Sequence, residues 1–354
     1  MVSAVTMGSS SSTPKGFNLI VGLFGILFSL GAVEIAVRSL VPLKGPKRWN
    51  DRPHGYFIPT SATNLQGESP QVKQVGAFRI SVVGDSFTFA PHMQYQDTFV
   101  KKLEGFLNLD AGTRRVEVFN MGVSGASTAD EVRLVDQALE IDSDLVILQI
   151  TLNDAEPKLL TAAEKAALYD APYLSSPIFT VWRSLGFVAR RIHNTTTVNR
   201  YIDYHTKYFR DPVTFKRFDD ALKMMKDRTK RKGVTLAAVL FPLFDFPIND
   251  RYPFKESHEI INGALRAHSV PALDLREAYR GIPPERLQVI PQKDSHPNEI
   301  AHRIAAERLL AFLGASELIP KEVLPQRVYR ARRNLRDKRL DIGVFLRRSS
   351  TASQ

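Results

Sequence analysis

The sequence predicts an α/β protein in three layers, with helices covering both faces of a mostly parallel five-stranded sheet. From residue 78 onward, short β-rich runs alternate with longer helix-like segments, which is typical of α/β domains. The runs are apolar at nearly every position, as expected for parallel strands buried on both faces. The predicted strands are 78–83, 116–119, 145–150, 234–241 and 272–275, and the predicted helices are 97–107, 127–139, 214–231, 257–268 and 298–313.

The composition agrees with a folded chain and excludes several chemistries. The chain has 354 residues, of which 44% are hydrophobic and 24% charged, as in ordinary globular proteins. That length suits one large domain with extensions. The chain contains no cysteine, so disulfides, thiolate zinc sites and a cysteine nucleophile are all excluded.

Most of the positive charge is close to the C-terminus. Residues 321–348 hold ten Lys and Arg against three acids, which is +7 of the formal net charge of +11. We interpret 316–354 as a basic tail that is either a solvated extension or a contact for anionic lipid or an acidic polymer. No nucleic-acid-binding motif accompanies it, so we predict no nucleic-acid partner.

The N-terminal region predicts a membrane anchor. Residues 1–15 are small and polar and predict disorder. Residues 16–33 carry no charge, and apolar residues continue past Glu34, so we predict one transmembrane helix over 16–37. A cleaved signal peptide would need a small-x-small cleavage site, which the segment lacks. A buried core helix is the other alternative, but the segment is apolar all round and follows a polar terminus.

The orientation of this helix is open to two interpretations. Lys15 precedes it and five Lys or Arg follow it before residue 53, which by the positive-inside rule places the C-terminal side in the cytoplasm. Short N-terminal anchors ahead of a large domain nevertheless commonly export that domain. We therefore expect a single-pass cell-membrane protein whose catalytic domain lies outside the inner membrane. Residues 38–75, rich in Pro, Gly and polar groups, predict a linker.

One region departs from the alternation of strands and helices. Residues 155–212 contain many aromatic and basic residues and no clear strand. We predict a mostly helical insertion, which either covers a functional site or only packs on the domain.

Two groups of polar residues together predict an activated serine. Gly84-Asp85-Ser86 follows the first strand directly, and a serine at such a turn is exposed beside backbone N–H groups that can stabilise an oxyanion. Asp294-Ser295-His296 precedes the last helix. A neutral imidazole can take the proton of a serine hydroxyl, and a carboxylate beside it fixes its tautomer.

Two further groups follow the second and third strands. These are Asn120–Gly125, whose glycines allow close approach to a ligand, and Thr151–Asp154, whose Asn153 could donate to an oxyanion. Because parallel strands end at one rim of the sheet, we expect all of these groups to meet there. Each group alone is a weak signal, but their ordered occurrence is not.

This ordered set resembles the SGNH/GDSL hydrolase family, whose four blocks supply Ser, Gly, Asn and His in that chain order. The resemblance covers about 76–315 and implies a flavodoxin-like sandwich. It implies that Ser86 is the nucleophile and that His296 is its base. It also implies three oxyanion donors, namely the N–H groups of Ser86 and Gly125 and the amide of Asn153. The N-terminal anchor is similar to that of membrane-anchored bacterial members.

The sequence departs from the family pattern at two positions. The usual spacing is Asp-x-x-His, but residue 293 is Lys, so the nearest acid is Asp294 in an Asp-x-His arrangement. This shorter spacing resembles acetyltransferase-type members that act on exported polysaccharides. Thr151 replaces a Gly often found two residues before Asn153, and we expect little effect from that change.

The sequence therefore predicts a carboxylic-ester hydrolase that acts through an acyl-serine, with Ser86, His296 and Asp294 as catalytic residues. One alternative is an O-acyltransferase acting on a cell-envelope or exported glycan, and another is a non-catalytic glycan-binding scaffold. We expect no metal or organic cofactor. The expected partners are an acyl ester, which a glycan could carry, and membrane lipid at the N-terminal helix. Acyl length, the natural substrate and the oligomeric state stay open.

Overall fold

The computed structural model describes residues 15–41, 72–109, 115–157, 161, 163–164, 170–291 and 294–325. The predicted disordered N-terminus, most of the predicted linker and the basic tail beyond 325 lie outside these residues. The chain divides into two compact units. The smaller unit comprises 1–48 and 160–200, and the larger comprises 49–159 and 201–354.

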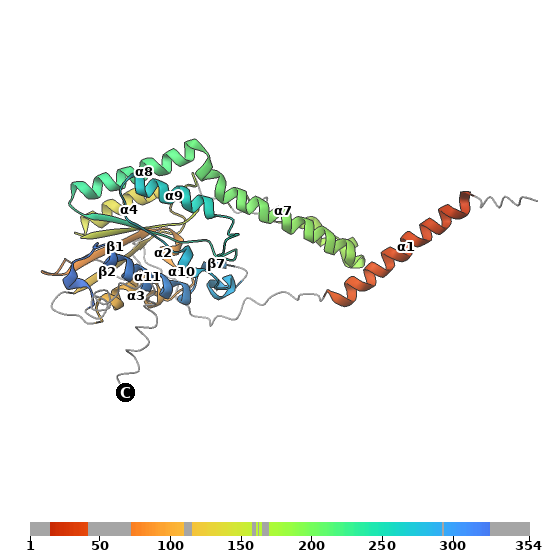
Figure 1. Ribbon diagram of the computed structural model, residues 1–354, viewed down its shortest axis with the longest axis horizontal. Helices are drawn as coiled ribbons and strands as arrows, with labels where there is room; N and C mark the ends of the chain where they lie inside the picture. Colours follow the sequence, from red (N-terminus) through yellow and green to blue (C-terminus); the bar gives the residue numbers. More distant parts are fainter. Residues whose placement is uncertain are drawn as a thin grey trace, which may run out of the picture. The chain divides into compact units, whose positions relative to one another are not determined.

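The larger unit is built on a five-stranded, fully parallel sheet (Figure 1). Its strand order, β2-β1-β3-β4-β5, is that of flavodoxin-like sheets. The three-layer fold predicted from the alternating pattern is thus confirmed. The strands are β1 (Phe78–Gly84), β2 (Val116–Gly122), β3 (Leu145–Ile150), β4 (Thr235–Leu240) and β5 (Ala272–Asp274).

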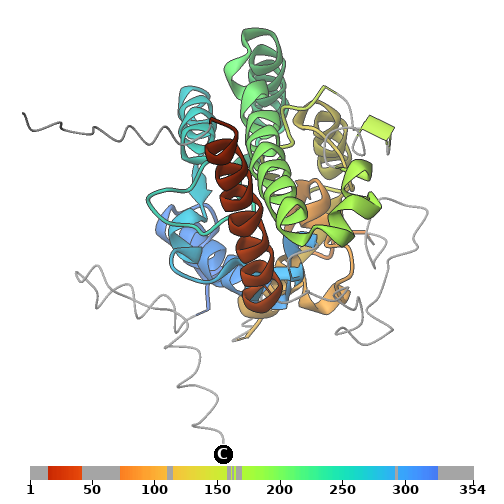
Figure 2. The same cartoon turned by 90° about the vertical axis from the view of Figure 1, so that its right-hand side faces the viewer.

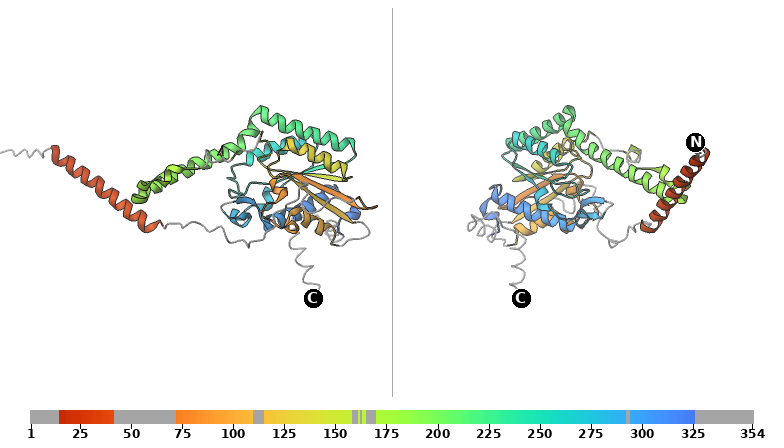
Figure 3. Two further views of the ribbon diagram at one scale, coloured as in Figure 1. Left: turned by 180° about the vertical axis from the view of Figure 1, so that it is seen from behind. Right: turned by 45° about the vertical axis from the view of Figure 1, so that its right-hand side comes forward.

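Helices cover both faces of this sheet, as Figure 1 and the view from behind in Figure 3 show. One layer holds α3 (Phe99–Leu107) and α11 (Glu299–Ala315), with the short α10 (Arg276–Tyr279) beside them. The other layer holds α4 (Thr128–Glu140), α8 (Pro212–Arg231) and α9 (Lys255–Ala267). Because both faces are covered, every residue of β1 and β3 is buried, which explains their unbroken apolar runs.

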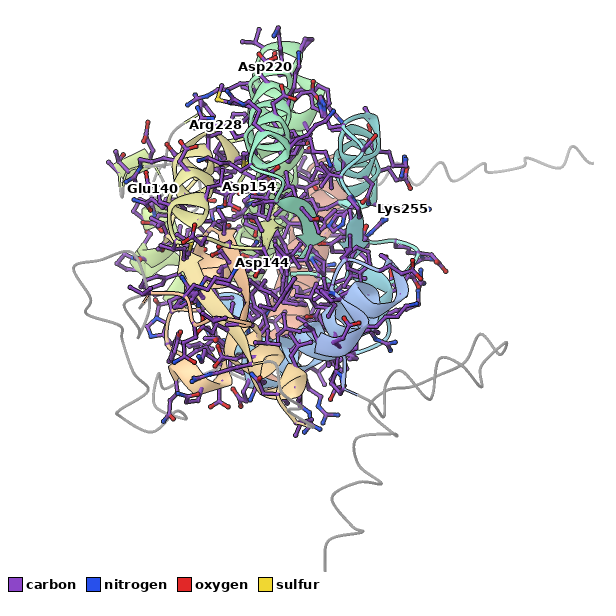
Figure 4. All side chains as sticks on the ribbon, turned by 90° about the vertical axis from the view of Figure 1, so that its left-hand side faces the viewer. Glu140, Asp144, Asp154, Asp220, Arg228 and Lys255 are labelled. Carbon is purple, nitrogen blue, oxygen red and sulfur yellow. The ribbon has the colours of Figure 1, made fainter. Side chains whose placement is uncertain are left out.

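Specific contacts join the helices within each layer. The ring of Phe99 in α3 stacks on the ring of His302 in α11, and the Phe99 N–H donates to His302 Nδ1 at 3.1 Å. In the other layer, Arg228 of α8 forms an ion pair with Asp136 of α4, and Figure 4 labels Arg228 on α8. These contacts fix the helix positions beyond what apolar packing alone requires.

The core extends past the end of α11. Ile319, Val323 and Leu324 are buried, and the Leu324 side chain packs where a Cβ on Gly314 would point. The first ten residues of the predicted tail are therefore part of the folded body.

A small second sheet lies ahead of α11, in a stretch for which we predicted no strand from the sequence. Strand β6 (Gln288–Ile290) pairs antiparallel with β7 (Asp294–Pro297). Strand β7 contains Asp294 and His296, so these two residues are held on a strand.

The smaller unit contains α1 (Lys15–Leu40), α6 (Pro177–Val181) and the first part of α7 (Arg183–Arg210). Within the described residues, Leu19–Leu40 is the one segment long and apolar enough to cross a membrane, by length and composition. The Glu34 carboxylate of α1 accepts hydrogen bonds from the N–H groups of Arg183 (2.9 Å) and Ser184 (2.7 Å). The end of α1 and the start of α7 are thus in contact, and both helices are visible in Figure 2.

We expect Gly122→Ala to destabilise the fold, because Gly122 ends β2 directly against the backbone of Thr88 and Phe89 in α2 (Ser86–Phe89). A methyl group there overlaps main-chain atoms that cannot rotate away. The free energy of unfolding should fall by about 1–3 kcal/mol, as in other overpacked cores. Urea unfolding of the two proteins would measure the difference.

Gly105→Ala is the matched control, because nothing lies within 4 Å of a Cβ at Gly105 in α3. That change should raise the free energy of unfolding by roughly 0.5–1 kcal/mol. Equal effects of the two substitutions would contradict the close approach of β2 to α2.

Candidate active site

Ser86 is held at the turn that follows strand β1, which lies between β2 and β3 in the sheet. Asp85 caps the short helix α2, and its Oδ1 accepts the Phe87 N–H at 2.8 Å. The Asp85 N–H and the Thr88 hydroxyl both donate to Gln149 Oε1 from β3, at 3.2 and 2.7 Å. The loop carrying Ser86 is therefore tied to the C-terminal end of β3, and Ser86 itself is only 8% exposed.

His296 contacts the serine, and Asp294 contacts the histidine. The distance from His296 Nε2 to Ser86 Oγ is 2.8 Å, and that from His296 Nδ1 to Asp294 Oδ1 is 2.5 Å. The His296 N–H also donates to Asp294 Oδ1 at 3.0 Å. These partners assign the tautomer with the proton on Nδ1, which leaves Nε2 free to accept from the serine hydroxyl.

The strand geometry of β7 explains why Asp-x-His works here. Side chains alternate across a strand, so residues two apart point to the same side. Asp294 and His296 therefore face the same way along β7, and the carboxylate reaches the imidazole with only one residue between them. The longer Asp-x-x-His spacing would place the two side chains on opposite sides of a regular strand.

The charges around His296 favour its protonated form. Burial alone would lower the pKa of His296, but the hydrogen bond and charge of Asp294, helped by Asp85 and Asp245, raise it above its ordinary value. Burial opposes ionisation of Asp294, yet its bonds from the His296 ring and backbone lower its pKa. The pair is thus an ionised carboxylate supporting a stronger base.

The two other predicted oxyanion donors lie on adjoining loops at the same rim. Gly125 follows β2 with φ +80°, a left-handed conformation that favours glycine. The Val123 N–H donates to Gly84 O at 2.9 Å, and the Thr128 N–H donates to Asp154 O at 3.1 Å. These bonds join the loops after β1, β2 and β3. The donor roles of Gly125 and Asn153 stay predictions, since the oxyanion forms only during reaction.

Thr151 links the serine loop to the Asn153 loop. Its hydroxyl lies 2.7 Å from Asp85 Oδ2 and also contacts Asn153 Oδ1. Its N–H donates to Asp154 Oδ2 at 2.5 Å. The glycine common at this position in the family could make no such side-chain bonds.

Two buried carboxyls that sequence reasoning missed lie behind this loop. Glu131 of α4 and Asp154 are at most 2% exposed, and Figure 4 labels Asp154 inside the body of the domain. Burial raises the pKa of both carboxyls well above the ordinary range, and the charge of Asp85 acts in the same direction on each. Burial therefore favours the neutral form of both carboxyls. Helical spacing with Thr128 and Val135 would have placed Glu131 on the buried face of α4.

Further polar groups approach the pair on the His296 side. Asp245 follows β4 and accepts from the Tyr201 hydroxyl at 2.7 Å, and its charge acts on His296. His92 Nε2 lies 3.9 Å from Asp294 Oδ2. The rule that loops after parallel strands share a rim could have identified Asp245. In the described part of the chain, no group of three or more His, Cys, Asp or Glu is placed to hold a metal ion.

The model of the GDSL-like lipase/acylhydrolase family matches residues 82–304, which include the whole of this geometry. The chain belongs to this family. Its GDSL domain is accordingly a serine hydrolase domain that acts on ester bonds. No curated protein matches the chain.

Several solved structures are similar to the GDSL domain in fold. TesA is 15% identical with a TM-score of 0.41, covering 68% of this chain and 99% of that chain. The esterase EstA from Pseudoalteromonas sp. is 15% identical with a TM-score of 0.40, covering 68% and 98%. The acetylxylan esterase Axe2 from Geobacillus stearothermophilus is 16% identical with a TM-score of 0.41, covering 67% and 94%.

The raised pKa of His296 predicts the pH dependence of the GDSL domain. The base must be neutral to accept the serine proton, so kcat/KM for an ester should fall as the pH drops through a pKa above the ordinary 6.5. Asp294→Asn should move this fall in kcat/KM to lower pH, because the negative charge that raises the pKa of His296 is lost. The plateau should fall by up to about 10⁴-fold, as in other triads that lose their carboxylate.

Asp245→Asn is the comparison, because Asp245 acts on His296 by charge without contacting Nδ1. Asp245→Asn should shift the fall in kcat/KM in the same direction but by less, and it should keep most of the maximal kcat/KM. If Asp294→Asn left the pH dependence of kcat/KM unchanged, Asp294 would not be the residue that orients His296.

We expect Thr151→Val to lower kcat with little change in KM, because valine keeps the shape but loses the hydroxyl that contacts Asp85 and Asn153. The loss should be about 10-fold or more, yet below the 10²–10³-fold expected for removing an oxyanion donor itself. Thr151→Ser should restore the rate. Steady-state kinetics with matched thermal unfolding separates this effect from misfolding, and equal rates for the valine and serine variants would refute the role of the hydroxyl.

Proposed function

We propose that the domain hydrolyses carboxylic esters through an acyl-serine intermediate. The observation that carries the proposal is the continuous hydrogen-bond chain from Ser86 Oγ through His296 to Asp294. A protein that only binds a glycan has no need for this chain, so the geometry favours catalysis over a scaffold role.

The reaction has two halves. Ser86 Oγ attacks the acyl carbon, its proton passes to His296 Nε2, and Asp294 stabilises the resulting imidazolium. The negative charge on the carbonyl oxygen is held by the Ser86 and Gly125 N–H groups and the Asn153 amide. His296 then protonates the leaving alcohol. In the second half, His296 takes a proton from water as that water attacks the acyl carbon of the acyl-serine. His296 then returns this proton to Ser86 Oγ as the acyl–oxygen bond breaks, which releases the acid and restores the serine.

An O-acyltransferase is the second candidate, and it shares every step up to the acyl-serine. A sugar hydroxyl would then replace water as the acceptor. The Asp294-x-His296 spacing favours this candidate through its resemblance to acetyltransferase-type members.

We further propose that α1 anchors the protein in a membrane and is retained. Its apolar segment is long enough to span, and Glu34 near its end holds the first N–H groups of α7. A leader cleaved after Glu34 would lose these bonds, which supports an uncleaved anchor.

Ser86→Ala should abolish hydrolysis of p-nitrophenyl acetate and butyrate by the full-length protein in detergent, with a loss of about 10³-fold or more. Ser124→Ala is the matched control, because Ser124 is exposed in the loop after β2 and should be dispensable. Full activity in Ser86→Ala would end the proposal.

Adding a glycan acceptor to the same assay separates the two candidates. Release of free acid at an unchanged rate supports the hydrolase. Acyl-sugar formed at the expense of free acid, and lost in Ser86→Ala, supports the acyltransferase.

A further inference from the structure

The segment from α6 into α7 exposes an unusual number of large apolar side chains. Each of these is 40–75% exposed. They are Ile178, Val181, Trp182, Leu185, Phe187, Val188 and Ile192, and we refer to them as the α6–α7 apolar surface. Leu185, Val188 and Ile192 are spaced three and four apart, so they form one stripe on the helix. A contiguous exposed apolar patch of this kind marks a contact with protein or membrane.

This surface begins where α7 meets the candidate membrane helix. Glu34 accepts the N–H bonds of Arg183 and Ser184, and Arg38 donates to Val181 O at 2.6 Å and to Glu34 Oε1 at 2.7 Å. A charged residue in an apolar helix is costly unless it is paired. Among the described residues, the partners of Glu34 belong to α1 or to the start of α7. The α6–α7 apolar surface is therefore continuous with α1.

The length of α1 places this junction at the membrane surface. Residues 16–33 have no charge, and at 1.5 Å per residue these 18 residues span about 27 Å. The hydrocarbon core of a bilayer is about 30 Å thick, so Glu34 lies close to its edge. Trp182, beside this junction, is the residue type enriched at that depth.

Basic side chains accompany the apolar stripe. Arg190 and Arg191 are both exposed and lie within the same two turns of α7 as Val188 and Ile192. Arginines at the level of the headgroups attract anionic lipid phosphates. The segment thus combines an apolar stripe, an interfacial aromatic residue and cationic side chains, which is the composition of helices that lie in a membrane interface.

We propose that the α6–α7 apolar surface lies in the interfacial region of the lipid bilayer and is a second membrane contact besides α1. Acyl chains contact Leu185, Val188 and Ile192, and anionic headgroups contact Arg190 and Arg191. The inference rests on the proposed anchoring by α1. The alternative occupant of this surface is a membrane-embedded protein partner. Vesicles that contain no other protein exclude this alternative.

The absence of native cysteine allows a direct test, because a single introduced cysteine carries the only label. The full-length protein is labelled with the environment-sensitive dye NBD and reconstituted into phosphatidylcholine–phosphatidylglycerol vesicles. Val188→Cys reports the proposed contact and Leu27→Cys reports α1. Val213→Cys is the matched control, since Val213 is an apolar residue of α8 that is 77% exposed. We expect blue-shifted emission and quenching by doxyl lipids at positions 188 and 27, and neither at 213.

The outcomes separate this inference from the anchoring proposal. Loss of quenching at position 27 would show that α1 does not span, and both proposals would fall. Quenching at position 27 with position 188 behaving like 213 would overturn the second contact alone. Adding Leu185→Asp and Ile192→Asp to Val188→Cys should remove the quenching at position 188. The same two substitutions added to Leu27→Cys should leave the quenching at position 27 intact. Quenching at position 188 that persists despite the two substitutions would contradict the proposed contact of Leu185, Val188 and Ile192 with acyl chains.

Discussion

The site depends on the interior position of β1 in the parallel sheet, between β2 and β3. β1 pairs with β2 on one side and with β3 on the other, and Gly84 pairs with Gly122 at the rim. In open α/β sheets, ligands bind where the chain leaves neighbouring strands in opposite directions, which here is between β1 and β3. Ser86 follows β1 and Asn153 follows β3, so the strand order brings the predicted nucleophile and the predicted amide donor to neighbouring positions at one rim of the sheet. A one-residue slip of β1 would turn its buried side chains to the opposite face.

The other two residues, His296 and Asp294, lie on a separate and much smaller sheet. The β6–β7 pair has only a few residues, and polar groups such as Gln288 and Asp294 make up much of it. It is held by bonds from outside the pair, since the Gln288 side chain donates to Phe244 O at 2.8 Å and Asn298 donates to Gln288 O at 3.2 Å. His296 is thus positioned by long-range packing, whereas Ser86 is positioned by the end of a long strand.

This difference explains what could be predicted from the sequence. Strands β1 and β3 are fully buried and β2 and β4 nearly so, which makes their apolar runs easy to locate in the sequence. Ser86 and His296 lie in family motifs, which locate these two residues as well. The β6–β7 pair has no apolar pattern, and its strands pair only because the surrounding structure holds them. The contacts of Thr151 could not be predicted either, because they depend on Asp85 from 66 residues away in the chain. The contact between Glu34 and α7 links residues about 150 positions apart and has no local signal.

The ionisable groups around the serine fall into two sets with opposite environments. On the His296 side, the pKa of Asp294 is lowered and that of His296 is raised, and in the proposed reaction this negative charge would stabilise the imidazolium. On the Asn153 side, burial raises the pKa of Glu131 and Asp154 and so favours their neutral form. If these two carboxyls were ionised, they would repel the oxyanion that Asn153 is expected to hold. Environments that push neighbouring carboxyls in opposite directions are how one site supplies both a charged and a neutral role at the same pH. In the proposed reaction, the burial of Glu131 and Asp154 on one side and the charge of Asp294 on the other therefore act in the same direction.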